Sequence, residues 1–243
     1  MFDTADERLR LPRVLEPRNA AVAKALLAHY LTDFTGRGFE TVGHRWDDPA
    51  HANVVTPSDL VALACLSVPV AGDTALHLLV DEAAVISELL RQLPEPHVTL
   101  WKAEADKITA PDAPLQTLWR TLRAVPGMGP TSTSKLLARK RANLVPIYDS
   151  VVAEAFGMRS SAGQWGAMRE LLLSDTGSGA LHEHLAELTR DVPGAEVVTP
   201  LRVLDIIVWY AHHPSPNQAV RRRHAFEQAG LDAEDAESAI TRA

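Results

Sequence analysis

The sequence predicts an all-α fold arranged as a two-lobed helical bundle. Apolar residues recur at helical spacing along most of the 243 residues, and several of these stretches follow residues that commonly begin helices. Only residues 54–55 and 196–198 suggest strands, and both stretches are very short. Helical periodicity therefore decides the fold class.

Four helices are expected before residue 93. The first covers residues 19–31, and two more cover 73–80 and 82–92. A fourth helix is predicted over residues 57–68, between the first helix and the second. Its start is indicated by the capping residue Thr56, which is followed by a proline and then by an acid at the third helical position. Residues 32–56 lack clean periodicity but hold many aromatic and polar side chains. This segment either lines a pocket or is an ordinary connecting loop.

The second half of the chain is predicted to be helical with Pro- and Gly-rich joints. Trp209 is expected in the core, with His212 and His213 at a helix end. We expect a middle lobe of residues 58–146 and a second lobe made of residues 1–57 and 147–243. The expected helices cover 115–124, 131–140, 150–156, 162–173, 180–189 and 200–212, followed by an Arg-rich helix.

Composition and charge exclude several classes of protein. No apolar run reaches membrane-spanning length and the N-terminus has no signal-peptide pattern, so we expect a cytoplasmic protein without a membrane partner. The single cysteine, Cys65, excludes an internal disulfide, a cysteine-built zinc site and an iron–sulfur cluster. A net charge of −7 argues against coating of nucleic acid by bulk electrostatics. Arg221–Arg223 either contacts phosphates or is a solvated run.

The turn at residues 125–130 joins two predicted helices and carries the most informative motif. Gly127 and Gly129 permit positive φ and close approach of a phosphate, because no Cβ intervenes. The following helix starts with unpaired amides and hydroxyls, and its two basic residues four apart would extend a basic face. The predicted DNA-backbone-binding residues are Gly127, Met128, Gly129, Thr131, Ser132, Thr133, Lys135 and Arg139.

One carboxylate, Asp149, follows this motif and precedes the predicted helix at 150–156. An aspartate in this place commonly caps a helix. A cap would also hold the carboxylate still, so a structural role and a catalytic role are compatible.

The chain resembles the helix–hairpin–helix DNA glycosylases that have a Gly/Pro-rich loop and a catalytic aspartate. The resemblance is sharp over about residues 115–155, where Val125–Gly129 and Pro146–Asp149 match the two halves of the family pattern at the family's spacing. It implies that Asp149 is the catalytic acid and that the hairpin holds a DNA phosphate. Thr131 stands where bifunctional members carry a Schiff-base lysine, and Lys135 one turn further is the alternative amine.

Two other features depart from the family. The C-terminal cysteine cluster that holds an iron–sulfur cluster in many relatives is absent. The segment that relatives insert near the flipped base, which contains glutamine in them, reads Leu66–Val70 here and has none. The usual damaged bases are therefore less certain substrates.

These observations predict a monofunctional DNA N-glycosylase, a hydrolase that flips a modified or damaged base and leaves an abasic site. We expect Asp149 at the seam of the lobes, duplex DNA with a flipped nucleotide as partner, a monomer, and neither cofactor nor metal. Tyr148 either stacks near the site or packs in the core. The candidate base-pocket residues are Phe34, Arg37, Phe39 and Tyr148.

The biological setting has two interpretations. The enzyme repairs damaged DNA, or it defends against phage whose DNA carries a modified base such as glucosylated cytosine. Two other classes stay open: a non-catalytic helix–hairpin–helix DNA-binding protein, and an unrelated helical protein with a coincidental Gly-x-Gly.

Overall fold

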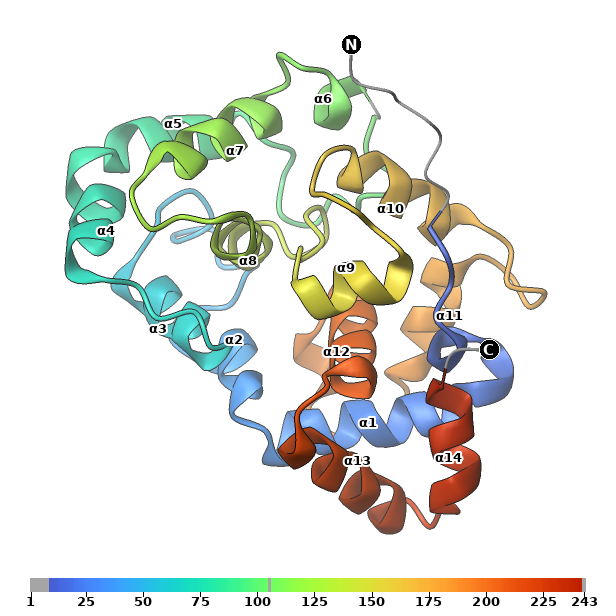
Figure 1. The fold of residues 1–243 in the computed structure, drawn as a ribbon. Coiled ribbons are helices and arrows are strands. Elements are labelled where there is room, and N and C mark those ends of the chain that lie inside the picture. The colour runs from blue at the N-terminus through green and yellow to red at the C-terminus, as the bar shows by residue number, and fades with distance from the viewer. Residues whose placement is uncertain (1–8, 105, 242–243) are drawn as a thin grey trace. The chain divides into compact units, whose positions relative to one another are not determined.

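The computed structural model describes residues 9–104 and 106–241, and over these residues the protein is all-helical (Figure 1). The predicted fold class is confirmed. The described residues contain no strand, and residues 54–55 and 196–198 lie in loops and a 3₁₀ turn. A single isolated bridge joins Asp175 and Ala180.

The chain forms two compact units. Thr35–Tyr148 makes the middle unit, and the segments before and after it make the terminal unit. Residues 35–57 therefore belong to the middle unit and not, as the sequence suggested, to the second lobe. The physical reason is that backbone carbonyls of this segment accept hydrogen bonds from Arg139 of helix α8 (Pro130–Lys140) and from Arg141, the residue after that helix, both in the middle unit.

In the middle unit, α8 is the central helix. Every side chain from Thr133 to Lys140 is buried, and α3 (Pro57–Cys65) and α7 (Pro114–Ala124) pack against this helix. A helix buried on all sides can place even its charged side chains against protein groups rather than water. The other helices of this unit are α2 (Gly38–Thr41), α3 (Pro57–Cys65), α4 (Gly72–Leu76) with a π-helical turn at His77–Asp81, α5 (Ala83–Arg91), α6 (Asp106–Thr109) and α7 (Pro114–Ala124).

Local sequence explains where α3 begins and ends. The Asp59 carboxylate accepts the Thr56 N–H at 2.8 Å, as the predicted start signal requires. The helix ends at Cys65 rather than at residue 68. Ser67 adopts a left-handed φ of 59° and Pro69 follows, so the helix cannot continue.

In the terminal unit, α12 (Pro200–His212) packs against α1, α9, α11 and α13. Its bounds match the prediction, because Thr199 caps it and Pro200 occupies its first turn. The remaining helices are α1 (Ala20–Asp33), α9 (Ser150–Phe156), α10 (Gln164–Leu173), α11 (Leu181–Leu188), α13 (Pro216–Gln228) and α14 (Ala233–Ile240).

Candidate functional site

The turn between α7 and α8 is held in shape from two sides. Gly127 is exposed with a φ of 83°, and a Cβ there would lie 2.6 Å from the Thr74 hydroxyl. That hydroxyl donates to the carbonyl of Pro126 at 2.8 Å. On the other side, the guanidinium of Arg123 donates to the carbonyl of Met128. The glycine is therefore required by both backbone angle and close contact.

The first turn of α8 leaves backbone donors available. Thr131 and Ser132 are half-exposed, and within the part of the chain that the structure describes their amides have no hydrogen-bond partner. Such amides, at the positive end of a helix of 11 residues, are suited to bind an anion. Gly129, the N-cap, is half-exposed and adds no side chain to obstruct that approach.

Two of the predicted phosphate-binding positions are wrong. The Met128 amide donates to the carbonyl of Val125 at 3.0 Å, and the Met128 side chain is buried. The Thr133 amide donates to the carbonyl of Gly129 at 3.0 Å, and its side chain is fully buried. Both amides donate hydrogen bonds within the turn and the first turn of α8, so neither is available to an anion.

Lys135 does not extend a basic surface. It is buried, and its ammonium donates to the carbonyl of Leu66 at 3.1 Å. Leu66 begins the loop between α3 and α4, so Lys135 fixes this loop against α8. The prediction that Lys135 contacts DNA is wrong for this reason.

Arg139 is a structural residue. Only 2% of it is exposed, and its guanidinium donates to the carbonyls of Phe39, Val42 and His44. Its Nε lies 3.3 Å from the Asp59 carboxylate. The prediction that it binds a DNA phosphate is therefore wrong, because its donors are spent inside the middle unit.

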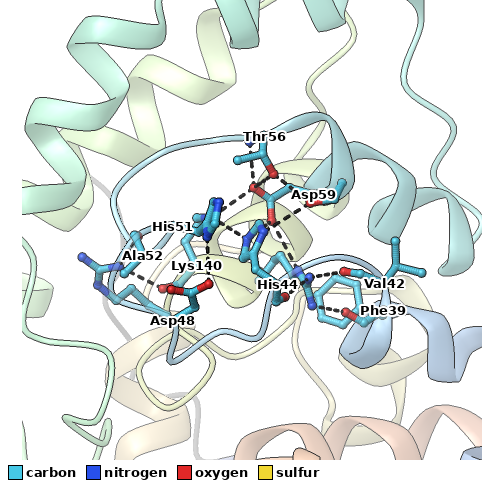
Figure 2. Close-up of polar contacts among 12 residues, drawn as sticks. Phe39, Val42, His44, Asp48, His51, Ala52, Thr56, Asp59 and Lys140 are labelled. Carbon is cyan, nitrogen blue, oxygen red and sulfur yellow. Dashed lines mark hydrogen bonds and ion pairs between the residues drawn. The ribbon is translucent and has the colours of Figure 1, made fainter.

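Asp59 is the centre of this buried cluster (Figure 2). Its carboxylate accepts from the Lys140 ammonium at 3.0 Å and lies 3.1 Å from Nε2 of His44, whose ring stacks on His51 at 4.5 Å. Burial is the largest single effect and raises the pKa of Asp59, but the charge and hydrogen bond of Lys140, the Thr56 N–H and His44 together outweigh it. The pKa of Asp59 therefore lies below its ordinary value. Burial lowers the pKa of Lys140 and of His44, although Asp59 opposes both shifts.

The four candidate base-pocket residues do not share one unit. Phe34 belongs to the terminal unit, and the other three belong to the middle unit. Phe39 is buried, 6.0 Å from the Arg139 guanidinium carbon, so its assignment to a pocket is wrong. Arg37 is exposed in a 3₁₀ turn. Tyr148 is half-exposed. Its backbone N–H donates to the Ser134 hydroxyl of α8, and its carbonyl accepts from the same hydroxyl.

Asp149 is the N-cap of α9. One carboxylate oxygen accepts the Val151 N–H at 3.0 Å, and the residue is half-exposed. This capping bond orients the carboxylate at the start of α9. Asp149 is also the first residue of the terminal unit after the chain leaves the middle unit.

Within the terminal unit, Asp149 interacts with the C-terminal end of α12. Burial lowers the pKa of His213, while the negative charge of Asp149 opposes that shift. His213 is the C-cap of α12, as expected, but Trp209 is half-exposed instead of buried and lies 4.5 Å from the His213 ring. Neither residue was a candidate from the sequence. The available signal was an aromatic residue and a histidine one turn apart at a helix end.

Arg123 is the other residue that sequence reasoning missed. It lies in the last turn of α7, is exposed, and its guanidinium is 4.0 Å from where a Cβ of Gly129 would be. It is therefore a cation beside the unpaired amides of α8. Its position just before the glycine motif was the only signal in the sequence.

The structure shows neither a metal site nor a membrane span in the part of the chain that it describes. No group of three His, Cys, Asp or Glu side chains that could hold a metal ion occurs among residues 9–104 and 106–241. In that same part of the chain, every helix is too short or too polar to cross a membrane.

The comparisons with known proteins give a family but no activity. No curated protein and no solved structure matches the chain significantly. A family model described as a family of unknown function, DUF6308, matches residues 23–212, well over half of the sequence. The chain thus belongs to the DUF6308 family.

Proposed function

We propose that this protein is a monofunctional DNA N-glycosylase. The observation that carries the proposal is the braced, exposed turn at Gly127, which is followed at the start of α9 by the oriented carboxylate of Asp149. The resemblance to helix–hairpin–helix glycosylases over about residues 115–155 gives these two features their roles.

The first role is to grip the DNA backbone. The amides of Thr131 and Ser132 and the guanidinium of Arg123 supply donors and positive charge for one phosphate. Because the net charge of the chain is −7, local donors rather than bulk attraction hold the strand. The strand is then bound tightly enough for one nucleotide to leave the duplex.

The second role is chemical. Breaking the C1′–N bond of a nucleotide develops positive charge on the sugar, as in glycoside hydrolysis. The ionised carboxylate of Asp149 stabilises that charge and orients or deprotonates the attacking water. Water adds to C1′, and the base leaves with the proton that balances it. The α9 cap keeps one carboxylate oxygen in place during this step.

The reaction stops at the abasic site. Thr131 stands at the position of the family's Schiff-base lysine, and a hydroxyl cannot form an imine. Lys135, the alternative amine, is buried against the carbonyl of Leu66. Alkali should therefore cleave the product strand, whereas the protein alone should not. Strand cleavage without alkali, together with a borohydride-trapped adduct, would contradict this part of the proposal.

The proposed enzyme acts as a cytoplasmic monomer on duplex DNA and needs no cofactor. Its substrate is a damaged base in repair, or a modified base such as glucosylated cytosine in defence against phage. The absence of glutamine from Leu66–Val70 is the departure that motivates the second setting.

The test is release of bases from a panel of genomic DNAs that includes heavily modified phage DNA, with the products identified by mass spectrometry. Asp149→Asn should abolish release while the helix cap is kept, because asparagine caps as well as aspartate. Asp232→Asn is the matched control, since Asp232 caps α14 of the same unit and should release bases as the wild type does. No release by the wild type from any DNA would overturn the proposal.

A non-catalytic DNA-binding protein is the second candidate. The capping bond from Val151 accounts for Asp149 without any chemistry. Salt-dependent DNA binding by both wild type and Asp149→Asn, with no base released by either, would favour this candidate.

A further inference from the structure

We propose that one surface of the terminal unit binds a single unpaired nucleotide, with the base against aromatic rings and the adjacent phosphate on an arginine. The surface consists of Phe34, Trp209, His213 and Arg221, and it adjoins Asp149. The inference rests on the proposed function in one respect, since the nucleotide would be the one extruded from duplex DNA.

The aromatic part of this surface is contiguous and half-exposed. The ring of Phe34 lies 5.4 Å from Trp209, and Trp209 lies 4.5 Å from His213. All three residues retain partial exposure. Behind them, the buried rings of Tyr30 and Tyr210 pack against Phe34 at 5.3 and 5.7 Å. A rigid second layer of this kind holds the outer rings in fixed orientations.

The cationic part comes from α13. The Arg221 guanidinium lies 5.0 Å from the centre of the Phe34 ring, and the residue is exposed. An arginine stacked on an aromatic ring keeps its in-plane donors available for a phosphate. Its only hydrogen bond among the described residues is a long one, 3.4 Å, to Gln218.

The three consecutive arginines of α13 have different environments. Arg222 donates to the Glu237 carboxylate at 3.2 Å and to the carbonyl of His213 at 3.4 Å, so it braces the end of α12. Arg223 is exposed and has no hydrogen bond or ion pair within the described part of the chain. Arg221 alone combines exposure with a contact to the aromatic surface. The run is therefore neither uniformly solvated nor uniformly a phosphate-binding patch.

His213 adds a polar group at the edge of the same surface. Its Nδ1 accepts the Ser215 N–H at 3.3 Å, which leaves Nε2 for a ligand. Burial lowers the pKa of His213, Arg221 and Arg222 act in the same direction, and Asp149 opposes them, so the neutral form of the ring is favoured at pH 7. A neutral imidazole with Nε2 protonated can donate to a carbonyl oxygen of a base.

These features match the chemistry of nucleotide binding. Aromatic faces bind any base by stacking, and a neighbouring arginine binds the backbone phosphate. The match to the DUF6308 model ends at residue 212. His213 and Arg221 therefore lie beyond it, and this chain supplies half of the surface from the C-cap of α12 and from α13.

The first test uses tryptophan fluorescence of the full-length protein with an oligodeoxythymidine of about eight nucleotides as probe. Stacking of a base on Trp209 should quench the signal. Trp209→Phe should remove most of the quench, because the indole that reports the stacked base is lost, and should weaken binding, because a phenyl ring offers a smaller face for stacking. Trp119→Phe, in α7 of the middle unit, is the matched control and should leave the quench in place.

The second test compares two arginines of one helix. Arg221→Gln should weaken binding of the same probe several-fold and lower the slope of log affinity against log salt by about 0.7, the value for one phosphate contact in a single strand. Arg223→Gln removes the same charge two positions away and should change neither quantity by more than a small fraction. Thermal unfolding followed by circular dichroism would verify that both variants fold.

The outcomes separate this inference from the proposed function. Equal binding and equal quenching by wild type, Trp209→Phe and Arg221→Gln would overturn the nucleotide surface, even if the wild type released bases. Loss of binding in both variants would support the surface, even if no base were released from any DNA. Equal loss in Arg221→Gln and Arg223→Gln would also overturn it, because charge alone would then explain the binding.

Discussion

The two ends of helix α8 use basic residues in opposite ways. At the C-terminal end, Arg139 and Lys140 are buried around Asp59 and hold residues 39–44 to the helix. At the N-terminal end, Arg123 from the preceding helix is exposed beside amides that have no partner within the described residues. The first end is therefore saturated and structural, whereas the second is available to a ligand.

Proximity to a glycine hairpin therefore does not by itself make a cation functional. A buried arginine whose donors all meet carbonyl oxygens stabilises the fold and cannot also hold a phosphate. A single exposed guanidinium braced by the turn can do so. The comparison predicts losses of stability at one end of α8 and losses of binding at the other.

The largest effect is expected at the saturated end. Asp59→Asn should lower the free energy of unfolding by about 3–5 kcal/mol, because two cations would stay buried without their carboxylate. Urea unfolding would measure it. Asp47→Asn is the control, since Asp47 pairs with Arg45 on the surface and should change stability by less than about 1 kcal/mol. Similar small losses in both variants would mean that the cluster is not the structural centre described above.

A smaller loss is expected from the turn itself. Gly127→Ala must adopt a φ of 83° and place its methyl 2.6 Å from the Thr74 hydroxyl. Gly157→Ala has nearly the same φ, 79°, and no atom within 4 Å. Both variants should lose about 1 kcal/mol to backbone strain, and Gly127→Ala should lose more because of the contact. Equal losses by differential scanning calorimetry would show that Thr74 does not constrain the turn.

The available end should respond in binding rather than in stability. Arg123→Gln should reduce the affinity for duplex DNA several-fold and lower the salt slope by about 0.9, as expected for one lost phosphate contact. Arg120→Gln, one turn earlier on α7, should bind as the wild type does, because Arg120 bonds to Pro111 and Thr117 at the other end of that helix. Fluorescence anisotropy at several salt concentrations would decide between these results.

The smallest effect concerns pH and the buried cluster. His44 faces Asp59, Lys140, Arg139 and His51, and burial lowers its pKa from the ordinary value of 6.5. A proton therefore binds the unfolded chain more readily, and stability should fall as the pH drops below about 6.5. His44→Gln should flatten this fall in urea unfolding at pH 8 and pH 5.5. If the loss of stability between pH 8 and pH 5.5 were the same in His44→Gln as in the wild type, His44 would not contribute to the pH dependence of stability. Three other histidines share the direction of this shift: His29, His184 and His213.

Local signals in the sequence predicted most of the helices. Thr56, Asp149 and Thr199 begin helices where capping residues should, and α9 and α12 have the expected bounds. Such signals act over one turn, so a single sequence reveals them. The early end of α3 depended on the left-handed backbone at Ser67, which residue type alone does not indicate.

Long-range contacts explain the errors at the site. Lys135 and Arg139 have helical spacing that suggested an exposed basic face, but their partners are carbonyls of Leu66 and of residues 39–44, which are distant in the sequence. Phe39 was misassigned for the same reason. Arg123 and Trp209 were missed because exposure, not residue type, distinguishes them from structural residues.

The most direct test of the account measures DNA binding and base release together for wild type, Asp149→Asn and Arg123→Gln on one DNA that the wild type cleaves at its glycosidic bond. Asp149→Asn should bind this DNA as tightly as the wild type and release no base, whereas Arg123→Gln should release base in proportion to its weaker binding. Base release by Asp149→Asn at the wild-type rate would contradict the account, since the carboxylate would then be a helix cap and nothing more.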